Sequence, residues 1–89
     1  MRYELLWTIS AQRDLQYLDR VSIDRITRKI LWFSQQSNPL RYAEPLTGLY
    51  TGIFRFRVGD YRALFKKDAK GQFVILVILR VKHRREAYK

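Results

Sequence analysis

The 89-residue sequence contains no cysteine and a single histidine, His83. Without cysteine, the chain can form neither a disulfide framework nor a thiolate zinc site. One histidine also leaves too few ligands for a transition-metal site and no basis for a Ser-His-Asp triad. The glycines are isolated from one another, so no phosphate-binding loop or dinucleotide motif is present. They are Gly48, Gly52, Gly59 and Gly71.

Long hydrophobic runs are also missing. The longest one, residues 73–79, is far shorter than the ~20 residues that a membrane helix needs. The first residues, Met1-Arg2-Tyr3-Glu4, show no signal-peptide pattern. A chain of 89 residues can build one hydrophobic core. We therefore expect a single domain over residues 1–89 in the cytoplasm, with no membrane partner and no small-molecule cofactor.

Acidic residues are scarce. Eight Asp and Glu residues stand against 18 Lys and Arg, which gives a net charge of +10, and arginine outnumbers lysine. The arginine guanidinium group is suited to bidentate contacts with phosphate and to stacking on bases. The charge excess therefore predicts a polyanionic partner, which is either a nucleic acid or a strongly acidic protein.

The stretch of residues 54–65 is typical of a β-hairpin. Its side chains alternate in character on both sides of Gly59-Asp60, and glycine at the first turn position is what a type II′ turn requires. One face of the hairpin carries mainly aromatic and aliphatic side chains. The other face carries the basic residues Arg55, Arg57 and Arg62.

This turn fixes how the two strands pair. If Val58 pairs with Tyr61, then Arg57 lies directly opposite Arg62. Like charges that face each other across two strands are destabilising, by a few tenths to about 1 kcal/mol. An anionic ligand between the two guanidinium groups would remove that cost. The hairpin therefore predicts a phosphate-binding surface.

The first half of the chain predicts a strand and two helices. Residues 2–7 alternate as a strand does. Ser10 is expected to cap a first helix, whose apolar residues fall at helical spacing as far as Leu18. Ser22 is expected to cap a second helix, in which residues 23–33 carry an amphipathic apolar stripe.

The second half predicts a loop followed by strands. Residues 35–48 contain both prolines and two turn-like clusters, so we expect an irregular loop that leads into the hairpin. Residues 73–81 are apolar at nearly every position, which predicts a central strand covered on both faces. A basic tail, residues 80–89, ends the chain.

Together these elements predict an α+β fold. Its order is an N-terminal strand, a two-helix hairpin and a three-stranded antiparallel meander. We expect the first strand to join the last one, and the helices to pack on one face of the sheet. The face that carries the hairpin arginines is then left open to a ligand.

Cleavage of RNA is one reaction that such a surface can support without a metal or cofactor. The ribose 2′-hydroxyl is a nucleophile that the substrate itself supplies. The protein then has to orient the strand, stabilise charge on the phosphoryl oxygens, and supply an acid and a base. Clustered arginines with one His, one Tyr and one Glu are sufficient for these tasks.

Two segments carry a resemblance to a known family. Residues 50–65, with the core Arg55-Phe56-Arg57-Val58-Gly59-Asp60-Tyr61-Arg62, and the tail segment His83-Arg84-Arg85-Glu86-Ala87-Tyr88 resemble the RelE/ParE toxin superfamily. Within it, the chain looks most like the RelE-type mRNA interferases. The resemblance implies a toxin of a type II toxin–antitoxin system that cuts mRNA in the ribosomal A site by metal-independent 2′-hydroxyl attack. It also implies a cognate acidic antitoxin that covers the basic surface.

The resemblance assigns roles to individual residues. Arg55 and Arg57 match two basic residues that hold the RNA backbone, and Arg62 matches the arginine that stabilises the transition-state phosphate. Tyr88 matches a C-terminal tyrosine implicated in catalysis and base stacking. The basic residues of the tail complete the predicted RNA-binding set, which is Arg55, Arg80, Lys82, Arg84 and Arg85.

The chain departs from the best-known members, which have lysines at positions 55 and 57. Arginine is not deprotonated in proteins, so neither residue can serve as the general base. A YoeB-like branch of the superfamily instead uses a Glu before the hairpin and a His near the C-terminus. By that resemblance Glu44 is the predicted base, and His83 is the predicted acid that protonates the 5′-oxygen leaving group. Tyr88 would then stack on a base.

Two alternatives remain open at this point. ParE-type inhibitors of DNA gyrase share the scaffold, and such a protein would have no nuclease activity. The chain could also be a catalytically weak toxin homologue that is bound by its antitoxin.

Overall fold

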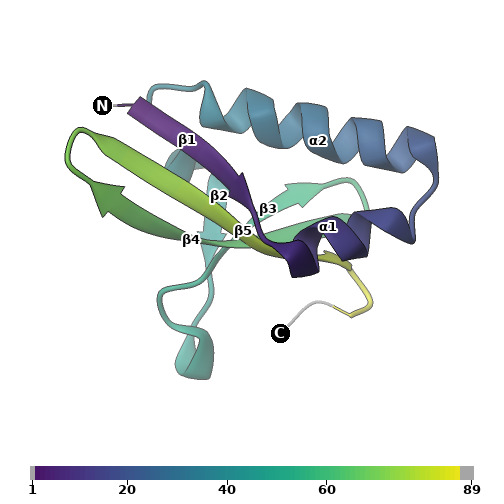
Figure 1. Cartoon of the computed structure of the whole chain (residues 1–89). Coiled ribbons are helices and arrows are strands. Elements are labelled where there is room, and N and C mark those ends of the chain that lie inside the picture. Colours follow the sequence, from purple (N-terminus) through teal and green to yellow (C-terminus); the bar gives the residue numbers. More distant parts are fainter. Residues whose placement is uncertain (1, 87–89) are drawn as a thin grey trace.

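A computed structural model describes residues 2–86 and shows two helices on a five-stranded sheet (Figure 1). The elements in chain order are β1 (Arg2–Trp7), α1 (Ile9–Gln16), α2 (Arg20–Ser34), the 3-10 turn η1 (Pro39–Tyr42), β2 (Ala43–Pro45), the 3-10 turn η2 (Gly48–Tyr50), β3 (Phe54–Val58), β4 (Tyr61–Lys70) and β5 (Phe73–His83). Neither helix is long and apolar enough to cross a membrane within this part of the chain.

The sheet has the order β1-β5-β4-β3-β2. β1 runs parallel to β5, and the other neighbours are antiparallel. The predicted order of elements and the pairing of the first strand with the last are therefore confirmed. The short strand β2 lies within the segment that we expected to be irregular. It pairs with the outer edge of β3, with Glu44 opposite Arg55, and so covers main-chain groups that an edge strand would expose.

The two helices begin earlier than predicted. Thr8, and not Ser10, caps α1: its hydroxyl oxygen accepts a hydrogen bond from the Ala11 N–H at 3.1 Å. Asp19, and not Ser22, caps α2, and its carboxylate accepts from the Ser22 N–H at 3.4 Å. In both cases the side chain that precedes the helix reaches the third N–H of the helix, which has no partner within it.

A β-bulge interrupts the pairing of β4 with β5. Leu64 pairs with Arg80 while the next residue, Phe65, pairs with Ile78, so Leu79 is the extra residue. Thr8 stabilises this point, because its hydroxyl donates a hydrogen bond to the Leu79 carbonyl at 2.9 Å. The bulge shifts the pairing of the rest of β5 by one residue, and such a shift moves side chains to the other face of a sheet.

The core lies between the helices and one face of the sheet. Phe33 of α2 stacks on Phe56 of β3 at 4.5 Å between ring centroids, and Phe56 stacks on Phe65 of β4 at 4.3 Å. These rings join α2 to the hairpin, so the apolar face of the hairpin is held rigidly. Its basic face therefore points away from the helices, as predicted.

The prediction that β5 is covered on both faces is wrong. Both helices contribute to the single core on one face. On the other face Leu6 of β1 and Phe73 of β5 are 47% and 40% exposed, and Ile75 and Val77 are only half-buried.

Candidate nucleic-acid interface

The hairpin β3–β4 has the predicted register. Val58 pairs with Tyr61, and Arg57 lies opposite Arg62. Gly59 has a φ of 58° while Asp60 does not have a positive φ, as a type II′ turn requires. The turn thus sets two arginines across from each other on the face that the helices leave open.

Arg62 is the buried centre of this face. The residue is only 9% exposed, and its Nη1 donates hydrogen bonds to the Gly59 and Tyr61 carbonyl oxygens, each at 2.9 Å. Those carbonyls hold the guanidinium group beside the turn. Among the described residues, no carboxylate forms an ion pair with its guanidinium group.

The surroundings of Arg62 are mostly positive. Burial lowers the pKa of its guanidinium group, and the neighbouring charges of Arg57, Arg55 and Arg84 lower the pKa further, while Glu44 opposes the shift. Arginine still carries its charge at neutral pH. The charge of Arg62 is therefore held at a cost to the folded state, and this cost falls when an anion binds.

Glu44 reaches this cluster from β2. Its Oε1 accepts a hydrogen bond from Arg55 Nε at 3.1 Å and lies 3.9 Å from Arg57 Nε. The structure thus brings together four of the residues predicted for catalysis or RNA binding: Glu44, Arg55, Arg57 and Arg62. Lys82 pairs with Arg62 across β4 and β5, so it lies on the same face.

Arg84 lies beside the hairpin turn. Its N–H donates to the Asp60 carbonyl oxygen at 2.6 Å, and its Nε lies 3.7 Å from Asp60 Oδ1. This anchors the start of the tail next to the arginine cluster. Arg85 is exposed in the following turn, and Tyr88 lies outside the described residues.

His83 is not brought to this cluster. It pairs with Tyr61, and its ring meets the Tyr61 ring edge-on at 5.4 Å, which places it on the face that the helices cover. Its Nδ1 accepts a hydrogen bond from the Arg85 N–H at 3.2 Å. The ring lines a cleft of about 260 Å³ at the end of α1. Glu44 and His83 are therefore on different faces of the sheet.

Arg80 has an acidic partner, Asp14 of α1. The Asp14 carboxylate accepts from Arg80 Nε at 2.8 Å, from Arg80 Nη2 at 3.0 Å and from the Val81 N–H at 2.8 Å. Burial alone would raise the pKa of Asp14, but these hydrogen bonds and the charges of Arg80 and Lys82 outweigh it and lower the pKa below 3.8. The pairing of β1 with β5 ends at Ile78, and beyond it the Asp14 carboxylate accepts the hydrogen bond of the Val81 N–H at this edge of β5. A contact with RNA by Arg80 stays a prediction.

Sequence reasoning missed Asp14 and Asp60, which position Arg80 and Arg84. The position of Asp60 in the predicted turn was a signal in the sequence that it could have a positioning role. The partner of Asp14 is 66 residues away in the sequence, so no local pattern could reveal it. The described residues contain no group of three or more acidic or histidine side chains that could hold a metal ion.

Comparison with known proteins places this fold and this hairpin in a family. Residues 5–88 match the family model for the ParE toxin of the type II toxin–antitoxin system, parDE. The chain belongs to the RelE/ParE toxin superfamily. It is therefore a toxin of a type II toxin–antitoxin system, as the resemblance of its hairpin and tail implied.

Its relatives carry names from both branches of the superfamily. The toxin is 35% identical to Toxin RelG of Mycobacterium tuberculosis (strain ATCC 25618 / H37Rv), over 100% of this chain and 99% of RelG. It is 33% identical to a chain of the toxin–antitoxin complex RelBE2 from M. tuberculosis, with a TM-score of 0.67 over 94% of this chain and 100% of that one. A chain of the chromosomal ParDE system from P. aeruginosa shares the fold alone, with a TM-score of 0.63 at 15% identity over 91% and 95% of the two chains.

Proposed function

We propose that this toxin is an endoribonuclease that cleaves mRNA on the ribosome by attack of a ribose 2′-hydroxyl on the adjacent phosphate. The observation that carries the proposal is Arg62, a buried arginine surrounded by further arginines on an open sheet face. A phosphodiester that gains charge in its transition state is the kind of ligand that such a group stabilises. The similarity to Toxin RelG and to a RelBE2 chain supports this proposal.

Each residue of the cluster has a part in the proposed reaction. Arg62 contacts the phosphoryl oxygens, while Arg55 and Arg57 hold the RNA backbone. The phosphate competes with Glu44 for the two arginines, which frees the carboxylate to accept the 2′-hydroxyl proton. The 2′-oxygen then bonds to phosphorus, the bond to the 5′-oxygen breaks, and the 5′-oxygen takes up a proton. The products are a 2′,3′-cyclic phosphate and a 5′-hydroxyl end.

The source of the last proton stays a prediction. His83 lies across the sheet from Glu44, and Tyr88 lies outside the described residues. A change in pH dependence on His83→Gln, with the cleavage pattern kept, would support His83 as the acid. An unchanged pH profile would favour Tyr88.

The experiment that tests the proposal is cut-site mapping on mRNA, with and without active translation. Wild-type toxin should produce cuts inside translated reading frames, and Arg62→Met should produce none. Met retains much of the length of the side chain while removing its charge and hydrogen-bond donors. If Arg62→Met cleaves as well as the wild type, the arginine cluster is not the active centre.

The family model, which is named for ParE, favours a second candidate: inhibition of DNA gyrase without RNA cleavage. A supercoiling assay separates the two. Inhibited supercoiling with intact mRNA would establish the second function. A toxin that does neither, yet still binds its antitoxin, would be the catalytically weak homologue.

A further inference from the structure

The turn of the β3–β4 hairpin is contacted from the helix side by Arg25 of α2. A Cβ atom placed on Gly59 would lie 3.2 Å from Arg25 Cζ, 3.3 Å from its Nη2 and 3.4 Å from its Nη1. Because these three atoms of one planar group are almost equally distant, the face of the guanidinium group, and not its edge, lies against the glycine. The other three glycines have nothing beyond their chain neighbours within 4 Å of the same position. The close approach is therefore specific to the hairpin turn.

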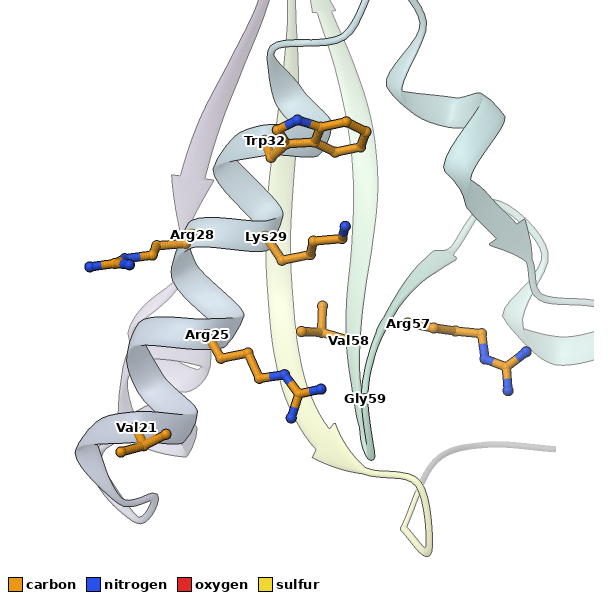
Figure 2. Close-up of a pocket in the computed structure, with 8 residues that line it drawn as sticks. All are labelled: Val21, Arg25, Arg28, Lys29, Trp32, Arg57, Val58 and Gly59. Carbon is orange, nitrogen blue, oxygen red and sulfur yellow. The ribbon is translucent and has the colours of Figure 1, made fainter.

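The direction of the Arg25 side chain is set by α2. Ile26 and Ile30 of this helix are 1% and 0% exposed, and their burial fixes the rotation of the helix about its axis. Figure 2 shows Arg25 extending from α2 toward Gly59, whereas Arg28, one turn further on, points away from the hairpin. Within the described part of the chain, Arg25 has no ion-pair partner. Its guanidinium group thus packs on the turn without a salt bridge that would hold it there.

The same turn holds Arg62 from the other side. The Gly59 carbonyl oxygen accepts a hydrogen bond from Arg62 Nη1 at 2.9 Å, and the Tyr61 carbonyl oxygen accepts a second one at 2.9 Å. Gly59 is therefore in contact with two guanidinium groups, since Arg25 packs on its Cα and its carbonyl oxygen binds Arg62. A movement of this one residue moves the acceptor that positions Arg62.

A glycine at the tip of a hairpin needs such support. Gly59 is exposed and has a φ of 58°, and glycine loses more conformational freedom on folding than any other residue. On the tail side the Arg84 N–H donates to the Asp60 carbonyl oxygen at 2.6 Å. Arg25 restricts the other residue of the turn from the side of α2.

The influence of Arg25 on Arg62 is one of packing. The neighbouring charges that shift the pKa of Arg62 are those of Arg57, Arg55, Glu44 and Arg84. Arg25 is not among them. An effect of Arg25 on Arg62 is therefore transmitted through the turn that both side chains contact.

We propose that Arg25 is a positioning residue for Arg62: it packs on Gly59 and so holds the carbonyl oxygen that aims the Arg62 guanidinium group at the phosphate. The inference rests on the proposed nuclease function, in which Arg62 stabilises the transition state. An error of about 1 Å in the placement of a reacting group can slow a reaction on the order of 10²-fold. A small displacement of the turn is therefore sufficient to slow cleavage, and Arg25 does so without touching the RNA.

The first test compares Arg25→Ala with Arg28→Ala in the cleavage of mRNA on ribosomes. Both variants remove one exposed arginine from the same helix, but only Arg25 extends to the turn (Figure 2). Arg25→Ala should lower kcat roughly tenfold and leave KM as it is in Arg28→Ala, because only an interaction of the transition state is weakened. A higher KM in Arg25→Ala than in the control, with kcat unchanged, would make Arg25 an RNA contact and overturn the proposal.

A double-mutant cycle with Arg62→Met determines whether the effect passes through Arg62. Arg25→Ala should slow the wild-type toxin roughly tenfold and should not slow Arg62→Met any further, since the group that Arg25 positions is then missing. The same fold-loss in both backgrounds would show that Arg25 acts independently of Arg62, and the proposal would fail.

A spectroscopic measurement tests the contact without relying on cleavage. The Nε–H signal of Arg62 in ¹⁵N-labelled toxin should report a rigid side chain in wild type and in Arg28→Ala, and a side chain mobile on the picosecond-to-nanosecond timescale in Arg25→Ala. Equal rigidity in all three proteins would overturn the proposal. If the wild type cleaves no RNA, the nuclease function is refuted, and this measurement still decides whether Arg25 positions Arg62.

Discussion

Arg62 and Arg80 lie on neighbouring strands of one sheet, and their surroundings are opposite. Arg80 contacts the Asp14 carboxylate through two of its nitrogens. Arg62 donates to two main-chain carbonyls, and the neighbouring charges of Arg55 and Arg57 repel it. A matched ion pair stabilises the fold, whereas a buried cation among cations stabilises an anion that comes from outside. We therefore propose that Arg80 maintains the structure and that Arg62 serves a ligand.

The first prediction tests this contrast at Arg62, where the largest effect is expected. Arg62→Met should slow RNA cleavage by about 10²–10³-fold, as the loss of one transition-state donor does. It should leave Tm unchanged or higher, because burial and neighbouring charges lower the pKa of Arg62 and so oppose its charged form. Cleavage kinetics and thermal unfolding measure the two effects.

Arg13→Met provides the control for this prediction, since Arg13 is an exposed arginine on α1. It should change neither cleavage nor Tm. A fall in Tm for Arg62→Met with cleavage retained would reverse the assignment and make Arg62 a structural residue.

The second prediction concerns the other arginine. Asp14→Ala should lower the free energy of unfolding by about 2 kcal/mol, because Arg80 loses its carboxylate and the Val81 N–H loses its acceptor. Cleavage well below Tm should stay at the wild-type rate. Asp24→Ala on the exposed face of α2 is the matched control and should have little effect on Tm. A large loss of activity in folded Asp14→Ala would show that the two arginine environments are coupled.

The third prediction uses pH to isolate the same carboxylate. In the folded toxin the Asp14 pKa lies below 3.8, so the unfolded state takes up protons first as the pH falls. The stabilisation is therefore fully present above pH 3.8 and is lost as the pH falls through the folded pKa. The difference in unfolding free energy between wild type and Asp14→Asn should shrink over that range.

Asp19 has a lowered pKa as well, so the wild-type profile alone does not identify Asp14. The difference between the two proteins removes the contribution of Asp19, which both retain. A constant difference across the acidic range would contradict the assignment to Asp14.

The two arginines also show what the sequence could predict. The position of Arg62 opposite Arg57 follows from the local sequence. The Gly59-Asp60 turn determines which residues pair, and the alternation of side chains along each strand determines which face they occupy. The setting of Arg80 depends on the bulge at Leu79. Counted from the pairing of Lys70 with Phe73, Val81 would lie opposite Arg62, but the bulge puts Lys82 there. A one-residue shift of this kind decides which tail residues join the arginine cluster and which, like His83, do not.

The bulge had a faint signal in the sequence and a tertiary cause. The buried positions Ile78 and Val81 are three apart, although strand alternation keeps one face at even spacing. What fixes the bulge is Thr8, whose hydroxyl donates to the Leu79 carbonyl 71 residues away. Contacts at that separation, like the pairing of Asp14 with Arg80, depend on the assembled fold and are invisible to local pattern.

The smallest effect on stability and RNA binding is expected at Glu44. Glu44 pairs with the hairpin arginines as Asp14 pairs with Arg80, but more weakly. Its contacts to Arg55 and Arg57 are 3.1 and 3.9 Å long and partly exposed, and such pairs contribute only about 0.2–1 kcal/mol. Glu44→Gln should therefore change stability little. It should tighten, by about threefold, the binding of an RNA whose 2′-deoxyribose lacks the nucleophile. The reason is that the phosphate no longer competes with a carboxylate for the arginines.

The control is Glu4→Gln, which removes the 4.0 Å pair with Arg2 on β1. It changes the net charge by the same amount outside the site and should bind the RNA as the wild type does. Equal tightening in both variants would mean that net charge alone sets the affinity. Glu44 would then not compete specifically for the arginines that we propose to bind the phosphate.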